Sequence, residues 1–421
     1  MTRTSRYDHR GTLLALLHDR GALARAELAQ ESGLSGATVR RVVDVLRRAG
    51  YVHEIVGPGE GPGRPPWMVE LVPGAAHVVG LDAGASLLRA VLVDLDGTVR
   101  ARAAHPARDP GNATALVEDL VAVAREVVVA AEGRRILAVA AGISGIVDHD
   151  AGRVRMSPDL PGLAGVDVAS ALGAALGVPV TIDNDDLLAA VGEVAAGAAR
   201  GARNAVFLSL GYGLGAGIVA NGQPWRGAAH AAGAVAFIGS PPLDERVSGR
   251  AVASRYVAAL ARSGMTDRAR LPASPDARWV FERAEAGDPI ARGLVADVVS
   301  SIADLAVVVA AVVDPEVIVL GGGIAANGEV VLRAVEERLG CTLPYPPRVV
   351  QSTLEGGAVV HGAAAVALSA AWTSLPASIN DAAHRAGGRR TRPDPDTASA
   401  HEPTDPDPGD DMAGVAVAGS H

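Results

Sequence analysis

The chain has 421 residues, of which 49% are hydrophobic and 20% are charged, and this is the composition of a globular protein. Its length exceeds what one hydrophobic core usually supports, so two or three structural units are expected. The net charge of −9 excludes a protein that coats nucleic acid over its whole surface, although it leaves room for a local basic element.

Signals for export, metal binding through thiolates and membrane insertion are weak. Cys341 is the single cysteine, so neither an intrachain disulfide nor a zinc site with several thiolates can form. The apolar run Leu13–Leu17 is not followed by a small-residue cleavage site, which argues against a secretory signal. The apolar stretch Leu305–Val313 lies between Asp304 and Asp314 and is too short to cross a bilayer. We therefore predict a cytoplasmic protein with no membrane partner.

Residues 1–73 are predicted to form three helices followed by a hairpin. The helical segments are Gly11–His18, Ala24–Glu31 and Gly36–Ala49. Gly33 suits a tight turn between the second and third helices, and Ser35 suits the N-cap of the third. The spacing of the apolar residues predicts that one stripe of this third helix is buried, and the stripe contains Val39, Val42, Val43 and Leu46.

The other face of the third helix is basic, because four arginines stand against one acid between Ser35 and Gly50. A glycine turn followed by a basic second helix matches the helix-turn-helix motif, in which the second helix enters the major groove of DNA. The segments Tyr51–Val56 and Trp67–Leu71 predict two paired strands, and their glycine-rich connection predicts a wing. The predicted DNA-binding residues are Ser35, Thr38, Arg40, Arg41 and, at the tip of the wing, Arg64.

Arg47 and Arg48 lie late in this helix, so we expect them to contact phosphate or nothing. The alternative for all of these arginines is an ordinary solvated helix face. We favour the DNA-binding interpretation because the turn, cap, basic face and wing occur in order within one segment. The expected partner is a double-stranded DNA operator.

Residues 76–372 alternate apolar strands with amphipathic helices, and this alternation predicts an α/β fold. The remaining segment, 373–421, is rich in Pro and Asp. It cannot bury enough apolar area to offset its ordering entropy, so we predict a disordered acidic tail there.

Four segments of the central part suggest phosphate chemistry, although each pattern alone is unspecific. An acid, a glycine and a hydroxyl at a strand turn can position magnesium and phosphate oxygens; these are Asp82, Gly84 and Ser86. The run 184–186 ends an apolar strand, and one of its carboxylates is suited to act as a general base. Two glycine turns permit close approach of the backbone to phosphate; they contain Gly211, Gly213 and Gly215, and Gly321, Gly322 and Gly323.

Taken in order, these segments resemble the ROK family of repressors, open reading frames and sugar kinases. The resemblance covers residues 8–372 and includes Gly33–Val39, Gly63–Pro65, Gly145–Asp148 and Ser157–Leu160. It implies a winged helix-turn-helix joined to an actin-like body of the ribonuclease H-like, sugar kinase type, with two lobes and a ligand cleft between them. It also implies assembly as homodimers or homotetramers.

The resemblance implies roles for single residues. Asp82, Gly84 and Ser86 correspond to the first phosphate motif of the family. Gly211, Gly213 and Gly215 correspond to the second, and Gly321 to Gly323 to the adenosine motif. Asn184 corresponds to a sugar-hydroxyl ligand and Asp185 to the catalytic base of the kinase members; the alternative for both is a strand-end turn.

The chain departs from the family pattern around the sugar. Ala234 stands where the family has a sugar-binding Glu, and Phe237 stands where it has a His that serves both sugar and zinc. Gly239–Pro242 replaces the cysteine-rich zinc loop, so no zinc and no other metal is predicted. Asp244 keeps the spacing of another sugar-contacting Glu, so we include it among the ligand-binding residues. Tyr212 adds bulk where the phosphate turn usually has Thr.

These departures favour regulation over catalysis. Each lost hydrogen bond to a buried sugar hydroxyl costs about 1–3 kcal/mol, so losing two weakens sugar binding roughly 30-fold to 10⁴-fold. Our first hypothesis is a transcriptional regulator, expected to be a repressor, that needs no cofactor and responds to a small sugar-like effector. The second is a sugar kinase that uses ATP and magnesium, with Asp185 as general base. The third is a scaffold that binds no ligand.

Overall fold

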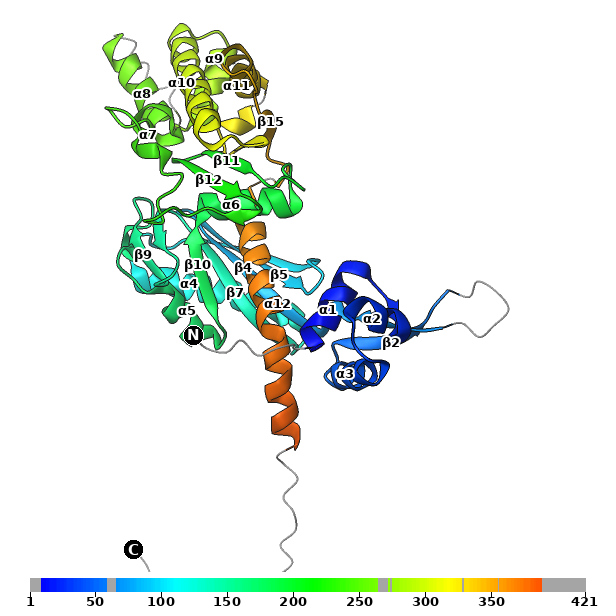
Figure 1. Cartoon of the computed structure of the whole chain (residues 1–421). Helices are drawn as coiled ribbons and strands as arrows, with labels where there is room; N and C mark the ends of the chain where they lie inside the picture. The colour runs from blue at the N-terminus through cyan, green and yellow to red at the C-terminus, as the bar shows by residue number, and fades with distance from the viewer. Residues whose placement is uncertain are drawn as a thin grey trace, which may run out of the picture. The chain divides into compact units, whose positions relative to one another are not determined.

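The structure is a computed structural model that describes residues 9–58, 66–263, 272, 275–327, 329–354 and 356–387. The first part contains three helices and a small antiparallel sheet in the strand order β1-β3-β2 (Figure 1). Its elements are α1 (His9–Arg20), β1 (Leu23–Ala24), α2 (Arg25–Ser32), α3 (Gly36–Arg48), β2 (Val52–Val56) and β3 (Trp67–Leu71).

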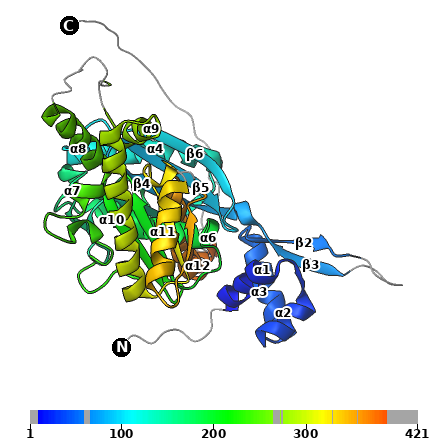
Figure 2. The ribbon, with the colours of Figure 1, turned by 90° about the horizontal axis from the view of Figure 1, so that it is seen from above.

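This part is a winged helix-turn-helix, as the sequence predicts. Gly33 ends α2 with φ of 68°, a left-handed conformation that glycine adopts without a steric penalty. The apolar stripe of α3 is fully or almost fully buried, and it packs with leucines of α1 and α2. Figure 2 shows the hairpin β2–β3 extending beyond the helices. The strand β1, which pairs with β3, is an element that the sequence analysis missed.

The body begins with a five-stranded mixed sheet, which we call lobe 1. Its strand order is β10-β7-β4-β5-β6, in which β10, β7 and β4 run parallel and β5 and β6 form an antiparallel extension. The elements are β4 (Ala76–Ala83), β5 (Leu87–Asp94), β6 (Val99–Pro106), α4 (Ala113–Val128), β7 (Arg135–Ile143), β8 (Ile146–Asp148), β9 (Arg153–Met156), α5 (Val168–Leu176) and β10 (Val180–Asn184).

Lobe 2 contains a second five-stranded sheet, with the order β13-β12-β11-β14-β15, and a layer of helices around α10 (Figure 1). Its elements are α6 (Asp185–Ala196), β11 (Ala205–Leu210), β12 (Leu214–Ala220), β13 (Gln223–Pro224), α7 (Asp244–Val247), α8 (Gly249–Arg262), α9 (Ala277–Glu285), α10 (Pro289–Val313), β14 (Val317–Gly321), α11 (Glu329–Thr342) and β15 (Arg348–Gln351). The predicted α/β fold with two lobes is therefore confirmed.

Two helices join the lobes. α6 follows the last strand of lobe 1 and packs on β12, whereas α12 (Ala358–Gly387) follows the last strand of lobe 2 and returns to the sheet of lobe 1. They cross in close contact at two glycines: a Cβ on Gly192 would lie 2.2 Å from the carbonyl oxygen of Ala358, and one on Gly362 would lie 1.8 Å from that of Leu188. Larger residues at these two positions would force the helices apart.

The predicted boundary of the acidic tail at residue 373 was wrong. Helix α12 continues to Gly387, and Leu375 and Ile379 are buried in one hydrophobic cluster with residues of the N-terminal helices and the sheet of lobe 1. The reason is helical spacing: Ala371, Leu375 and Ile379 lie on one face of α12. The rest of the predicted tail, 388–421, lies outside the described residues.

We expect Leu375→Ala to lower the free energy of unfolding by about 2–5 kcal/mol, because it removes buried methyl groups and leaves a cavity. Denaturant unfolding of the full chain measures this. Ser369→Ala, on the exposed face of the same helix, is the matched control and should change stability by less than about 0.5 kcal/mol. Equal stabilities for the two variants would show that the end of α12 does not pack on the core.

The apolar stretch Leu305–Val313 also differs from the prediction, because it is the end of the 25-residue helix α10 and not a short isolated run. Among the described residues, α10 and the segment Ala358–Ala377 of α12 are long and apolar enough to cross a membrane. Both pack in cores of this fold. Asp297 and Asp304 of α10 form ion pairs with arginines of neighbouring helices, as expected for a core helix with one polar face.

Candidate functional site

The first candidate site is the exposed face of α3. The Ser35 hydroxyl accepts a hydrogen bond from the Thr38 amide at 3.2 Å and lies 2.9 Å from the Thr38 hydroxyl, so the predicted N-cap is confirmed. Ser35, Arg40 and Arg41 are exposed, and Thr38 is partly exposed. Within the described part of the chain, no ion pair involves Arg40, Arg41, Arg47 or Arg48. Arg64 lies outside the described residues.

The acid of α3 does not weaken this basic face. The Arg25 guanidinium donates to Asp44 at 3.2 Å and to Glu54 at 3.0 Å, so one arginine of α2 braces both α3 and β2. Because Asp44 pairs with Arg25 of α2, no arginine of α3 forms an ion pair with it in the described part of the chain. The exposed face of α3 is therefore basic, as the sequence count predicts, and it fits the negative potential of DNA.

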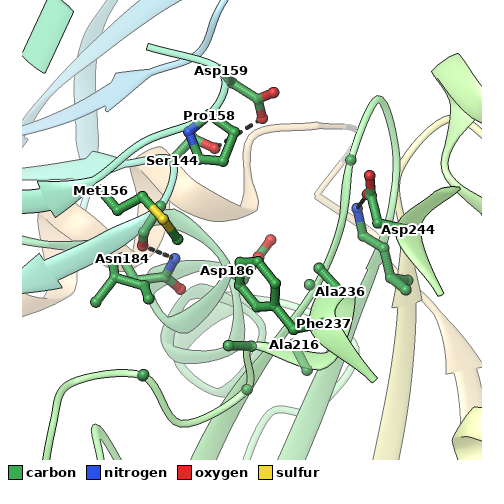
Figure 3. Close-up of a pocket in the computed structure, with 18 of the residues that line it drawn as sticks. Ser144, Met156, Pro158, Asp159, Asn184, Asp186, Ala216, Ala236, Phe237 and Asp244 are labelled. Atoms are coloured by element: carbon green, nitrogen blue, oxygen red, sulfur yellow. Dashed lines mark hydrogen bonds between the residues drawn. The ribbon is translucent and has the colours of Figure 1, made fainter. Parts of the chain in front are cut away.

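The second candidate site is a cavity of about 270 Å³ between the lobes (Figure 3). Lobe 1 contributes the Ser144 and Asp159 loops and Asn184 at the end of β10. Lobe 2 contributes Asp186 of α6, the start of β12, the segment 230–237, and Asp244 and Arg250. The structure thus brings the predicted ligand-binding residues Asn184 and Asp244 to the same cavity.

Hydrogen bonds within the protein already use much of Asn184. Its Oδ1 accepts from the Leu187 amide at 2.8 Å and caps α6, while its Nδ2 donates to the Gly145 carbonyl at 2.8 Å and to Asp185 at 3.1 Å. The Asn184 side chain can therefore keep its structural role at the strand end and also bind a ligand, but only through the second lone pair of Oδ1. Asp185 does not line this cavity; it lines a neighbouring one on the phosphate side.

Asp186 is the carboxylate that the sequence analysis did not select. It lines both cavities, and burial raises its pKa to about 6. Burial also raises the pKa of Asp185 well above its ordinary value, helped by the charges of Asp186, Asp82 and Asp159. Carboxyl groups with raised pKa values in a cleft are typical of functional sites. The available signal was the position of Asp186 one residue after Asp185, at the start of helix α6, where its carboxylate packs against Gly215 of β12.

The opposite wall of the cavity is apolar. Ala216, Ala234, Ala236 and Phe237 line it, and Phe237 is half exposed. The two departures from the family pattern, Ala234 and Phe237, therefore both face the cavity, as Figure 3 shows for Phe237. This wall offers van der Waals contact in place of hydrogen bonds.

His230 is a further cavity residue that the sequence analysis missed. It has φ of 55°, a left-handed conformation that is unusual for a residue with a side chain. Its Nε2 lies 3.6 Å from Asp148, and its Nδ1 is buried with no hydrogen-bond partner in the described structure. A strained residue with an unsatisfied buried nitrogen at a cavity wall is a typical mark of a binding position.

Ion pairs connect the two lobes around this cavity. Arg250 of α8 lies 3.3 Å from Asp159 of lobe 1 and also pairs with Asp244 of α7. Arg226 of lobe 2 lies 2.6 Å from Asp183 of lobe 1. Asp244 is thus held by Arg250 and by the Leu214 amide at 3.0 Å, which gives it a bracing role in addition to its place in the cavity wall.

The predicted phosphate segments converge beside the cleft. Gly84, Ser86 and Gly213 line the second cavity with Asp185, and Gly211 and Gly323 line a third cavity further along. Gly215 lies within β12, where a Cβ would come within 1.7 Å of Asp186, so close packing on α6 already requires glycine there. Gly321, the last residue of β14, likewise packs closely, in this case against the Phe207 ring. Gly322 turns the chain with φ of 93°.

Two features interrupt this phosphate path. Asp82 forms a 2.9 Å ion pair with Arg89, and burial raises the pKa of Asp82 to about 6 although Arg89 lowers it. Tyr212 is exposed, and Arg250 lies 5.7 Å from its ring centre; both residues line the second and third cavities. The acid that would hold magnesium is therefore tied to an arginine. Across the described ranges, no cluster of three or more His, Cys, Asp or Glu residues is arranged to hold a metal ion.

Comparison with known proteins assigns both parts of the chain. The ROK family model matches residues 78–370, and a model for winged helix-turn-helix DNA-binding matches residues 9–53. A putative xylose repressor of Caldicellulosiruptor is 26% identical over 379 residues, which are 85% of this chain and 94% of that protein. A glucokinase of Streptomyces coelicolor is 28% identical over 284 residues, which are 62% of this chain and 86% of the glucokinase.

The solved structures likewise include a regulator and a sugar-phosphorylating enzyme of the ROK family. A ROK family transcriptional regulator, a homolog of the E. coli MLC protein, matches this structure with a TM-score of 0.72. The match covers 88% of this chain and 98% of the regulator's chain, and at 21% identity it shows the fold. A ROK hexokinase from Thermus thermophilus, 27% identical, covers 69% of this chain and 97% of its own with a TM-score of 0.59. Because the ROK model matches well over half of the chain, the protein belongs to the ROK family and carries a winged helix-turn-helix DNA-binding domain at its N-terminus.

Proposed function

We propose that this protein is a cytoplasmic, sequence-specific transcriptional repressor whose affinity for DNA is set by a sugar or sugar derivative in the cleft between the lobes. The observation that carries the proposal is the face of α3: an ordered N-cap, exposed Arg40 and Arg41, and an acid, Asp44, that pairs with Arg25 of α2. Regulators among the relatives match over both the DNA-binding part and the body, which supports the same function.

The cleft favours an effector of monosaccharide size with one polar and one apolar face. Asn184, Asp186 and His230 offer acceptors and donors on one side, and Phe237 with its alanine neighbours offers apolar contact on the other. At about 270 Å³ the cavity lies at the small end of the range for small-molecule sites. A sugar that lacks a hydroxyl, or that carries an apolar substituent, fits these walls better than a fully hydroxylated hexose.

The effector changes DNA affinity only if it binds unequally to the DNA-competent and DNA-incompetent arrangements. The ion pairs Arg250–Asp159 and Arg226–Asp183 link the lobes beside the cavity, so a ligand there acts directly on lobe closure. Assembly as a homodimer would place two α3 helices on a two-fold operator, with half-sites separated by whole helical turns.

The test uses the full-length protein and DNA from the region upstream of its own gene, in a fluorescence anisotropy titration repeated at several salt concentrations. We expect a sequence-dependent affinity that falls steeply with salt, and release of the DNA by at least one sugar of a monosaccharide panel. Equal affinity for scrambled DNA would contradict the proposal. Operator binding that no sugar alters would leave a repressor but refute its control through the cleft.

A second candidate function is sugar phosphorylation, because the phosphate segments and Asp185 meet at one cavity beside the cleft. In that case ATP and magnesium are required, Asp82 holds the metal, and Asp185 takes the proton of the sugar hydroxyl. The Arg89–Asp82 ion pair and the Tyr212–Arg250 contact oppose it. Release of ADP with any sugar of the panel, abolished by Asp185→Asn, would establish the kinase.

A further inference from the structure

A fourth cavity, outside the cleft, lies on the face of the lobe 1 sheet that α12 covers. Its volume is about 610 Å³, and it is bounded by β5, β6, the segment before α12 and the first turns of that helix. None of its lining residues lines any of the three cavities described above. Whatever binds here is therefore a different ligand from the cleft effector or a second molecule of it.

Among the described residues that line this cavity, those with ionisable side chains are Arg89, Arg102 and His361. In the antiparallel pairing of β5 and β6, Arg89 stands opposite Ala104 and Val91 stands opposite Arg102, so both arginines project from the same face of the sheet. His361 of α12 meets them from the helix, with its Nε2 3.4 Å from Arg102. Arg102 forms no ion pair with any carboxylate in the described ranges.

The charges of this cavity repel one another. Burial lowers the pKa of His361, and the nearby Arg102 lowers it further, while Glu193 of α6 raises it. One terminal nitrogen of Arg89 donates a hydrogen bond to Asp82 at 2.9 Å, and the other would lie 3.9 Å from a Cβ on Gly356. An arrangement that gathers two guanidinium groups around a neutral imidazole gains free energy when an anion enters.

The first turn of α12 adds to this field. The His361 amide bonds back to the Gly357 carbonyl at 3.0 Å, so the amides that precede it in the helix have no acceptor within α12. Such amides and the helix dipole favour negative charge. The remaining lining, which includes Val91, Leu354 and Val360, is apolar and suits an organic portion of the ligand.

We propose that this cavity binds a small phosphorylated metabolite, with the phosphate between Arg89, Arg102 and His361. Two planar guanidinium groups match the oxygen geometry of a phosphate monoester, which carries nearly two charges and three acceptor oxygens. A single carboxylate would leave one guanidinium without a partner. The cavity is larger than the cleft cavity, so it accommodates the organic part as well.

The position of Arg89 gives the site a connection to the cleft. The same guanidinium bonds Asp82, and the charge of Asp82 acts on Asp185 beside the cleft. An anion at Arg89 competes with Asp82 for this arginine. Occupation of the fourth cavity therefore alters the electrostatic field of the phosphate-side cavity without any contact between the two ligands.

The experiment is isothermal titration calorimetry of the full-length protein at constant ionic strength with three probes: inorganic phosphate, glucose 6-phosphate and glucose. We expect saturable binding of glucose 6-phosphate and weaker binding of inorganic phosphate. Arg102→Gln and His361→Ala should each weaken both by about ten-fold or more, because each removes a charge-assisted hydrogen bond. Glucose reports on the cleft and should bind equally to parent and variants, if it binds at all.

Arg125→Gln is the matched control, because it removes the same charge from α4, which packs on the opposite face of the sheet. Phosphate binding in this variant should equal that of the parent. No saturable heat with either phosphate probe would overturn the proposal, and so would phosphate binding that survives both Arg102→Gln and His361→Ala. Binding of inorganic phosphate at the site without glucose 6-phosphate would reject the metabolite and identify a free-phosphate site. None of these outcomes depends on whether the protein binds DNA.

Discussion

Replacement of both Arg40 and Arg41 by alanine is expected to weaken operator binding by at least about 30-fold, because each lost contact to a base edge is worth about 1–3 kcal/mol. Both residues are exposed on α3, in its N-terminal half, which is the part that contacts base edges in this motif. Neither packs in the core, so the melting temperature should not change. Fluorescence anisotropy with the operator and with scrambled DNA measures the effect.

The matched control removes the same charge from the other end of the helix. Arg47→Ala with Arg48→Ala should reduce affinity for operator and scrambled DNA alike and lower the salt slope, because these residues lie late in α3 and can reach only phosphates. The sequence preference should survive in this variant. If the Arg40 and Arg41 double variant keeps the affinity and preference of the parent, α3 is not the recognition helix and the regulator proposal fails.

The DNA-binding domain could be predicted almost completely because its signals are local. The N-cap at Ser35, the turn at Gly33 and the apolar period of α3 each depend on residues within one or two helical turns, and all three are confirmed. The role of Asp44 could not be predicted in this way. Its partner, Arg25, stands on another helix, and only the fold shows which acids Arg25 pairs with.

The cleft was predictable only in part, for the same physical reason. Sequence order identified the segments that meet there, and the structure places Asn184, Asp244, Phe237 and the glycine turns around adjoining cavities. The direction of a side chain at a strand-to-helix junction depends on how the helix starts. The sequence therefore predicted Asp185 as a ligand-binding residue, whereas Asp186 lines the cleft cavity. His230 and Arg89 carried no motif, and their contacts come from chain segments more than six residues away.

The sequence predicted α12 and α10 to be shorter than they are. Composition predicted an end of order near residue 373, but a helix already packed on a core continues as long as one face stays apolar, and Leu375 and Ile379 satisfy this. Likewise the apolar run near residue 305 is short by itself, whereas helical periodicity extends it back to Pro289. In both cases tertiary burial, which composition windows do not contain, sets the length of the element.

Asp186→Asn is expected to stabilise the protein above pH 6 by about 1–3 kcal/mol and to have little effect near pH 4. The pKa of Asp186 is about 6 in the folded protein and near 3.8 in the unfolded chain, so the unfolded state loses its proton first as the pH rises. The parent therefore loses stability between about pH 4 and pH 6, and a neutral amide escapes this loss. Denaturant unfolding of parent and variant at both pH values measures it.

Asp183→Asn, the same isosteric change three residues earlier, should have the opposite sign. Burial raises the pKa of Asp183, but hydrogen bonds from His149 and Arg226 lower it overall, so this carboxylate contributes stability above its unfolded pKa that is lost as the pH falls. Its replacement leaves Arg226 without its charged partner and should destabilise the protein by about 3–5 kcal/mol at neutral pH. If Asp186→Asn also destabilises, Asp186 is a structural acid like Asp183. If Asp186→Asn stabilises the protein, the charged Asp186 side chain lowers the stability of the parent. This is expected of a residue that is kept in the cleft to bind a ligand.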